Sequence, residues 1–174
     1  MSAFEQAFAI VIGTEGGYGC DAADRGNWTG GACGAGTLRG TKYGVSAAAY
    51  PALDIANLTL DQAHGIYKTD YWDKVRGDDL HPAFALLVFD AAVNNGPGRA
   101  ISWFQGAVHT TPDGVIGPVT IAAAATGGAN ALVEFQARRL LFMASLATWP
   151  RFGPGWSRRL CRLPYQAMSM GDAA

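Results

Sequence analysis

Eleven of the 23 glycines in this 174-residue chain fall between Gly13 and Gly44. Glycine reaches left-handed backbone conformations that other residues avoid, so this density predicts a backbone that bends tightly and repeatedly. Glu15 lies near the start of this stretch. It is one of only three glutamates in the chain and is followed by Gly16, Gly17 and Tyr18. The region from about 17 to 44 is therefore expected to form a small lobe of loops or a β-hairpin.

A helix is predicted immediately before this lobe. Ser2 and Glu5 have the spacing of a capping box, and apolar side chains follow with helical spacing at Phe4, Phe8, Val11 and Ile12. One more turn of the same face reaches Glu15, after which Gly16 and Gly17 would stop the helix. Burial and the negative end of the helix dipole should then raise the pKa of Glu15, as a general acid requires. The alternative is a solvated glutamate at a frayed helix end.

The rest of the chain has mostly helical periodicity. Thr59 and Gln62 form a second capping box that opens a helix to about Trp72, and Pro82 suits the first position of a central buried helix over 83–94. Further helices are expected over 99–108, from Pro118, from Asn130 to about Leu146, and from about Trp156 with a break at Pro164.

The predicted fold class is mainly α, with a helical body and the small glycine-rich lobe. The length and the 49% hydrophobic content suit one domain over residues 1–174. Its catalytic part would span residues 1–80 and contain Glu15 and the glycine-rich lobe. A helical part would span residues 81–174.

Charge and cysteine content exclude several classes of partner. A net charge of −1 gives no general attraction to nucleic acid. Arginines are concentrated near the C-terminus, where they either contact an anionic bacterial envelope or form a solvated helix face: Arg138, Arg139, Arg151, Arg158, Arg159 and Arg162. The three cysteines fit neither a disulfide framework nor a zinc site, and the three histidines lie far apart, so no metal or cofactor is expected.

Two further expectations concern redox state and export. Cys20 and Cys33 flank the glycine-rich loop, so the alternatives are reduced thiols or a disulfide formed after release into an oxidising space. The apolar run from Phe8 to Gly13 is too short for a signal peptide, and no basic residue precedes it. We therefore expect a protein made without an export signal.

Residues of the glycine-rich stretch suit the cleavage of a glycosidic bond. That reaction needs an acid for the leaving oxygen and a second group that holds water or stabilises positive charge on the sugar. Glu15 suits the first role, and Asp24 can reach the opposite side of a sugar ring from the turn that follows. Thr41 can position the water, and Tyr18 and Tyr43 can stack on sugar faces. The alternative for Asp24 is a turn residue, and for the others a structural role.

Several ordered motifs resemble one family. Glu-Gly-Gly-Tyr at 15–18, Asp-x-x-Asp-x-Gly at 21–26 and Gly-Thr-Lys-Tyr-Gly-Val-Ser at 40–46 are similar to the N-terminal signature of glycoside hydrolase family 108. That family comprises peptidoglycan muramidases of bacteriophage endolysins and related secretion-associated lysozymes. Later blocks at 66–72, 89–96 and 113–118 also look like the family, including its predicted peptidoglycan-binding half, so the resemblance covers about Phe4 to Leu141.

The resemblance implies a lysozyme-like fold in which Glu15 is the catalytic glutamate and Asp24 and Thr41 are its partners. Their order also resembles the triad of phage-type lysozymes, which hydrolyse with inversion. Residues 27–40 look like an insertion relative to the shortest family members, so Thr29 competes with Thr41 for the threonine role. We expect glycan contacts from Tyr18, Tyr43, Tyr71, Asn94, Asn95 and Trp103.

The leading hypothesis is a monomeric endolysin that hydrolyses the β-1,4 bond between N-acetylmuramic acid and N-acetylglucosamine in peptidoglycan. A lytic transglycosylase that uses Glu15 alone is the nearest alternative. The other is a non-catalytic wall-binding module built on the block at 113–118 and on Tyr71, Trp72 and Trp103. The endolysin resemblance implies accumulation in the host bacterial cytoplasm and action on the wall after release by a separate pore former.

Overall fold

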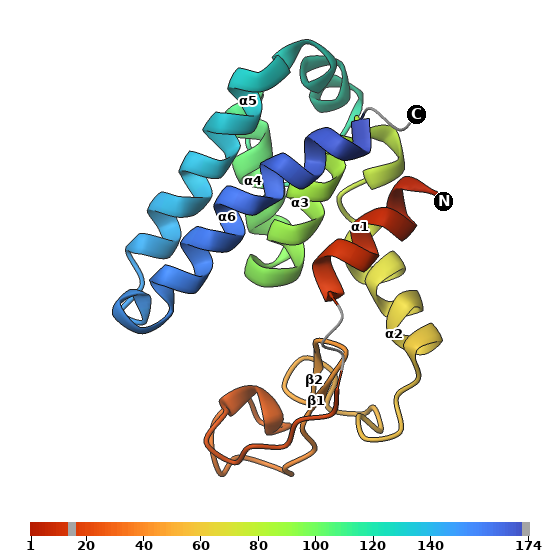
Figure 1. The fold of residues 1–174 in the computed structure, drawn as a ribbon, viewed down its shortest axis with the longest axis vertical. Coiled ribbons are helices and arrows are strands. Elements are labelled where there is room, and N and C mark those ends of the chain that lie inside the picture. The colour runs from red at the N-terminus through yellow and green to blue at the C-terminus, as the bar shows by residue number, and fades with distance from the viewer. Residues whose placement is uncertain (14–16, 172–174) are drawn as a thin grey trace. The chain divides into compact units, whose positions relative to one another are not determined.

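A computed structural model describes residues 1–13 and 17–171 of the chain, and its fold is mainly α, as predicted (Figure 1). Short 3₁₀ segments lie at Arg25–Asn27 and Gly77–Asp79, and a π-helical segment at Lys68–Trp72. The main elements are α1 (Ala3–Ile12), β1 (Thr41–Lys42), β2 (Val45–Ser46), α2 (Leu60–Tyr67), α3 (Pro82–Asn95), α4 (Pro97–Ala107), α5 (Pro118–Ala144) and α6 (Trp149–Gly171).

The chain forms two compact units. We call Phe8–Lys68 the glycine-rich unit, and Met1–Ala7 together with Thr69–Ala174 the helical unit. Among the described residues, no helix combines the length and the apolar character needed to cross a membrane.

Helix α1 begins as predicted but ends early. The backbone N–H of Glu5 donates to Ser2 Oγ over 3.1 Å, which satisfies one of the free amides of the first turn. The predicted end at Gly16 and Gly17 is wrong, because the helix ends at Ile12 and Gly13 takes a left-handed φ of +66°. Glu15 lies outside the described residues, so the elevated pKa inferred for it stays a prediction.

Glycines shape the glycine-rich unit at two close approaches. Strands β1 and β2 pair antiparallel, and an isolated bridge joins Gly19 to Thr41. At Gly40 a side chain would place its Cβ 2.4 Å from the carbonyl oxygen of Gly19. At Gly44 a Cβ would lie 2.3 Å from the hydroxyl of Tyr67. Both glycines have positive φ, so the predicted lobe depends on residues without a side chain.

Helix α2 starts with the predicted capping box. Gln62 N donates to Thr59 Oγ1 over 3.2 Å, and Thr59 N donates to Gln62 Oε1 over 2.9 Å. Further along α2, the Tyr67 hydroxyl donates to the Tyr43 carbonyl over 3.1 Å. This bond fixes the β1–β2 turn to the helix.

The helical unit is organised around α3, as the sequence predicts for 83–94. Every residue from Ala83 to Ala92 is buried, and α3 packs against α4 and α6, while α5 packs against both of those helices (Figure 1). Trp72 is fully buried and lies 5.4 Å, centroid to centroid, from both Phe4 and Phe89. Trp72 is therefore part of the core and does not form a sugar platform.

Helix α5 starts at Pro118, as expected, and bends at Gly128, where φ is +55°. The predicted break of the last helix at Pro164 is wrong, because α6 continues through Pro164 to Gly171. An internal proline costs a helix roughly 3 kcal/mol. Burial of a large apolar side chain stabilises the folded state by about 1.5–3 kcal/mol. Both Leu163, before the proline, and Met170, after it, are buried. Packing therefore outweighs the proline.

Candidate functional site

Asp24 is placed by its own backbone turn. It is the N-cap of the 3₁₀ segment Arg25–Asn27, and its Oδ1 accepts a hydrogen bond from Gly26 N over 2.8 Å. The side chain is exposed, and among the described residues its Oδ2 has no hydrogen-bond partner. One carboxylate oxygen is thus fixed, and the other is open to water.

Thr41 is linked to this turn through Asn27. The Thr41 hydroxyl donates to Asn27 Oδ1 over 2.7 Å, while Asn27 Nδ2 donates to the Asp21 carbonyl over 3.0 Å. Asn27 is only 3% exposed, and its N–H donates to the Asp24 carbonyl over 3.1 Å. The structure therefore brings the Asp24 turn and Thr41 together around one buried amide.

This arrangement fixes the chemistry of the Thr41 hydroxyl. A threonine hydroxyl has one proton to donate and two lone pairs to accept with. The proton is used by Asn27, so towards a water molecule Thr41 acts as an acceptor. A water between Thr41 and Asp24 would donate both its protons to them and keep a lone pair free for attack.

The competing residue, Thr29, has a different hydrogen-bond role. Its Oγ1 accepts the backbone N–H of Thr37 over 2.8 Å, and its own N–H donates to the Thr37 carbonyl over 3.0 Å. A Cβ at Gly36 would lie 2.3 Å from Thr29 Oγ1. Thr29 thus closes the loop of the apparent insertion, a structural role that Thr41 does not share.

Tyr18 borders a surface hollow in the glycine-rich unit. The hollow has a volume of about 380 Å³ and is lined in part by Tyr18, Arg39 and Asp54. Tyr18 is 46% exposed, and its hydroxyl donates to the Arg39 carbonyl over 3.3 Å. A hydrogen bond with the Cys20 side chain raises the pKa of Tyr18 above its ordinary value of 10.0. The ring is therefore an exposed, neutral platform at a concave surface.

Tyr43, also predicted to contact glycan, occupies the β1–β2 turn with a left-handed φ of +50°. The Lys42 ammonium lies 5.5 Å from the centroid of its ring, and Lys42 also donates to the Ala56 carbonyl over 2.9 Å. Glycan binding by Tyr43 stays a prediction.

The predicted glycan contacts in the helical unit take part in its internal structure. Trp103 is half-buried and lies 5.3 Å from the ring of Phe142, and Tyr71 is half-buried in the π-helical segment. Asn94 Nδ2 donates to the Asp90 carbonyl over 2.7 Å, and Asn95 Oδ1 accepts from Arg139 Nε over 3.0 Å. Glycan contact by these four residues stays a prediction.

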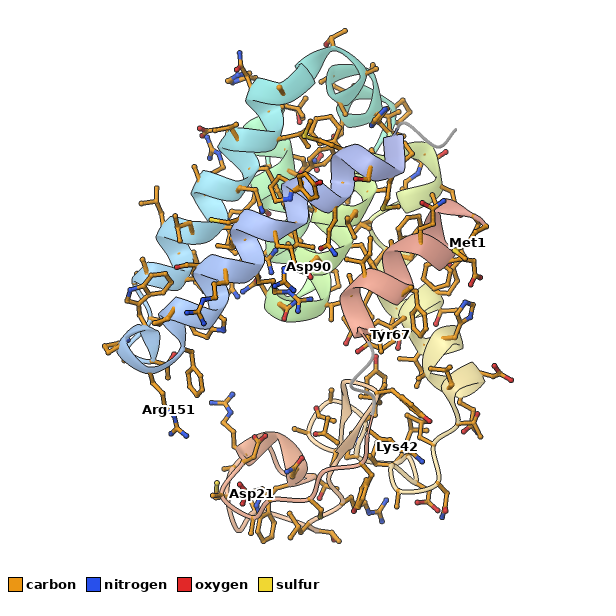
Figure 2. The ribbon with its side chains drawn as sticks, in the orientation of Figure 1. Met1, Asp21, Lys42, Tyr67, Asp90 and Arg151 are labelled. Carbon is orange, nitrogen blue, oxygen red and sulfur yellow. The ribbon has the colours of Figure 1, made fainter. Side chains whose placement is uncertain are left out.

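Asp90 lies at the centre of a buried ion-pair network. Its Oδ2 accepts from Arg139 Nη1 over 2.6 Å, and both side chains are completely buried. Arg159, on α6, donates through Nε to Asp90 Oδ1 over 2.8 Å. Figure 2 labels Asp90 within the helical unit. Burial lowers the pKa of Arg139, and the adjacent Asp90 carboxylate opposes that shift. At least one of the C-terminal arginines is therefore structural.

The block at 113–118 is likewise held from inside the helical unit. Gln105 is 1% exposed, and its Nε2 donates to Asp113 Oδ1 over 2.6 Å and to the Val115 carbonyl over 3.0 Å. Its Oε1 accepts from Gly114 N over 2.9 Å. This turn owes its shape to one buried glutamine.

Sequence reasoning missed Asn27, because its role depends on contacts made across 14 residues of loop. The available signal was the repeated polar residue at short spacing, Asp21, Asp24 and Asn27, before the glycine-rich loop.

All three cysteines are free in the structure, so no bond joins Cys20 to Cys33. Among the described residues, no group of His, Cys, Asp or Glu side chains could hold a metal ion.

Glycoside hydrolases use a carboxylate to activate water. In this mainly helical protein, the Asp24 carboxylate lies on the same small lobe as the Thr41 hydroxyl, which can accept a hydrogen bond from water. The family model described as Glycosyl hydrolase 108 matches residues 8–96, which include the whole glycine-rich unit. The chain belongs to glycosyl hydrolase family 108 and is a peptidoglycan hydrolase.

The structure extends the likeness to nearly the whole chain. The solved structure of Brucella abortus SagA is similar, with a TM-score of 0.81 and 32% sequence identity over 97% of this chain and 95% of that one. The shared fold is the mainly α, lysozyme-like fold that the sequence predicts. A search among curated proteins found no match.

Proposed function

We propose that this protein is an N-acetylmuramidase that hydrolyses the β-1,4 bond between N-acetylmuramic acid and N-acetylglucosamine. The observation that carries the proposal is the hydrogen bond from Thr41 to buried Asn27 beside the Asp24 turn. It favours a site built to hold a water molecule, which a hydrolase needs and a transglycosylase does not.

In the proposed reaction, Glu15 protonates the leaving glycosidic oxygen as the bond from that oxygen to the anomeric carbon breaks. The water oxygen forms the new bond to the anomeric carbon, and Asp24 takes one of its protons. Thr41 accepts the second hydrogen bond and so orients the water. Glu15 ends deprotonated and Asp24 protonated, and one proton exchange with solvent restores the starting state.

Asn27 is a positioning residue in this scheme. It acts through Thr41, because its Oδ1 accepts the only proton of the Thr41 hydroxyl. The family signature supports Glu15 as the acid, and the hydrogen bonds of Thr29 support Thr41 as the threonine of the site.

The test is mass spectrometry of soluble fragments released from purified peptidoglycan by the wild type and by Glu15→Gln. The proposal expects reducing muropeptides from the wild type and none from the variant. Anhydro-sugar products would reassign the protein as a lytic transglycosylase. Wild-type levels of release by Glu15→Gln would remove Glu15 from the acid role, and binding without release by the wild type would indicate a wall-binding module.

A further inference from the structure

Aromatic and basic side chains gather at the turn between α5 and α6. We call this surface the α5–α6 tip and define it by Leu141, Trp149, Arg151, Phe152, Trp156 and Arg158. Figure 2 labels Arg151 at this end of the helical unit, where its side chain extends away from the ribbon. We propose that the α5–α6 tip docks onto the headgroup region of an anionic phospholipid bilayer.

The rings of the tip form one cluster. Phe152 stacks on Trp156 with centroids 5.8 Å apart and an interplanar angle of 28°, and Trp149 lies 6.1 Å from Trp156. A Cβ at Gly153 would lie 2.7 Å from the Trp149 ring, so glycine at this position lets the indole rest on the helix backbone. The cluster is therefore held in place within the first two turns of α6.

The ring cluster lies on the same face of α6 as the residues that are buried in the helical unit, but it is more exposed than they are. Trp149 and Trp156 share a helical face with Leu160, Leu163 and Ala167, which are buried in the helical unit. The two tryptophans are only half-buried. Phe152 is 43% exposed and Leu141, on α5, is 72% exposed. The tip thus presents an apolar surface to solvent.

The charge around this surface has one sign. The Arg151 guanidinium lies 5.0 Å from the centroid of Phe152, and Arg158 is exposed. No Asp or Glu occurs between Glu134 and Asp172, although the whole chain has a net charge of −1. Arginine beside tryptophan and phenylalanine suits the membrane interface, where phosphates meet the acyl chains.

Composition favours lipid over glycan as the occupant. A site for sugar needs polar groups that fix the orientation of the hydroxyls beside the aromatic platform. Residues 141–165 contain no Asp, Glu, Asn, Gln or His. Their charged groups are all arginines, which pair with phosphate. An anionic bilayer matches both the apolar cluster and its positive rim.

The test is co-sedimentation of the full chain with vesicles of phosphatidylglycerol and phosphatidylcholine in equal parts, and with phosphatidylcholine alone. We expect binding to the anionic vesicles only, with a blue shift of tryptophan fluorescence and weaker binding at high salt. Phe152→Ser should weaken partitioning roughly tenfold. Arg151→Gln with Arg158→Gln should weaken it about twenty-fivefold, at about fivefold for each charge.

Two matched controls separate the tip from general surface effects. Val119→Ser removes an apolar side chain that is 73% exposed elsewhere on α5, and Lys74→Gln removes an exposed charge. Both should bind vesicles as the wild type does. Turnover of purified peptidoglycan should be unchanged in all of these variants, so failure of this proposal is distinguishable from failure of the muramidase assignment.

Equal vesicle binding by wild type and tip variants would overturn the proposal. So would equal binding to vesicles without phosphatidylglycerol. Loss of binding to purified peptidoglycan in Phe152→Ser, with no binding of the wild type to vesicles, would also overturn it and would identify the tip as a glycan platform.

Discussion

If Asn27 acts only by orienting Thr41, then removing Asn27 should have no effect on turnover once the Thr41 hydroxyl is gone. The perturbations are Thr41→Val, Asn27→Ala and the two together. Thr41→Val removes one hydrogen bond to a water that becomes charged in the transition state, worth about 1.5–3 kcal/mol, so kcat should fall roughly tenfold to a hundredfold. Asn27→Ala frees the hydroxyl to rotate and should lower kcat about tenfold. The double variant should match Thr41→Val.

The free energy of unfolding tests the hydrogen bond between Thr41 and Asn27 independently of turnover. Asn27 is only 3% exposed, and Thr41→Val removes the donor to its Oδ1. A buried acceptor without a donor should cost about 1–3 kcal/mol of unfolding free energy. Asn27→Ala also removes the bond to the Asp21 carbonyl and should cost about 2 kcal/mol. The coupling between the two positions should be about 1 kcal/mol.

The assays are the initial rate of turbidity loss of purified peptidoglycan and urea unfolding followed by circular dichroism. Thr41→Ser keeps the hydroxyl and should retain near wild-type turnover, and Thr37→Val alters an exposed threonine of the same loop as a control. Multiplicative effects of the two single changes on kcat would refute the positioning role of Asn27.

Three further changes test other parts of the account. Asp24→Asn keeps a side chain that caps the 3₁₀ segment equally well, so circular dichroism should show an unchanged fold while kcat falls roughly 10²- to 10⁴-fold; comparable activity would exclude Asp24 as the base. Arg139→Met should cost about 3 kcal/mol of unfolding free energy, because Asp90 stays buried with one fewer partner. Arg138 is half-exposed, so the control Arg138→Met should cost about 1 kcal/mol or less. Equal losses in urea unfolding would contradict the structural role of the buried ion-pair network. The hydrogen bond from Gln105 lowers the pKa of Asp113 below its usual 3.8, so wild type should be more stable than Asp113→Asn at neutral pH. The stability difference should shrink as the pH falls through the lowered pKa. A stability difference that is constant from pH 7 to acid would contradict this role of Asp113.

Local signals predicted the helix starts that carry a cap or a first-turn proline, whereas α6 begins at Trp149, earlier than the predicted start at about Trp156. The Thr59 and Gln62 capping box and Pro82 each open a helix where the sequence places one, because caps depend on residues only a few positions apart. The predicted end of α1 is too late, because the helix ends before the single Gly13 and does not reach the glycine pair at 16 and 17. At Pro164 the local rule was outweighed by burial of residues on both sides, which sequence spacing alone does not quantify.

The candidate site was predicted in part. Motif spacing singled out Asp24 and Thr41 as candidates, and the structure joins both to Asn27. Their catalytic roles stay predictions, and Glu15 lies outside the described residues. Asn27 and Gln105 could not be predicted, because each is defined by a buried side chain that bonds to a loop distant in sequence. The same limit applies to Asn95, whose amide bonds to Arg139 inside the helical unit across 44 residues.

The most direct test of the central claim is the configuration of the sugar first released, followed by proton NMR during digestion of soluble peptidoglycan glycan strands. If a water held by Asp24 and Thr41 attacks the anomeric carbon directly, cleavage of the β-1,4 bond proceeds with inversion. The first reducing end should then be the α-anomer, with the β-anomer appearing only through mutarotation. Initial release of the β-anomer, or of a product without a reducing end, would contradict the account.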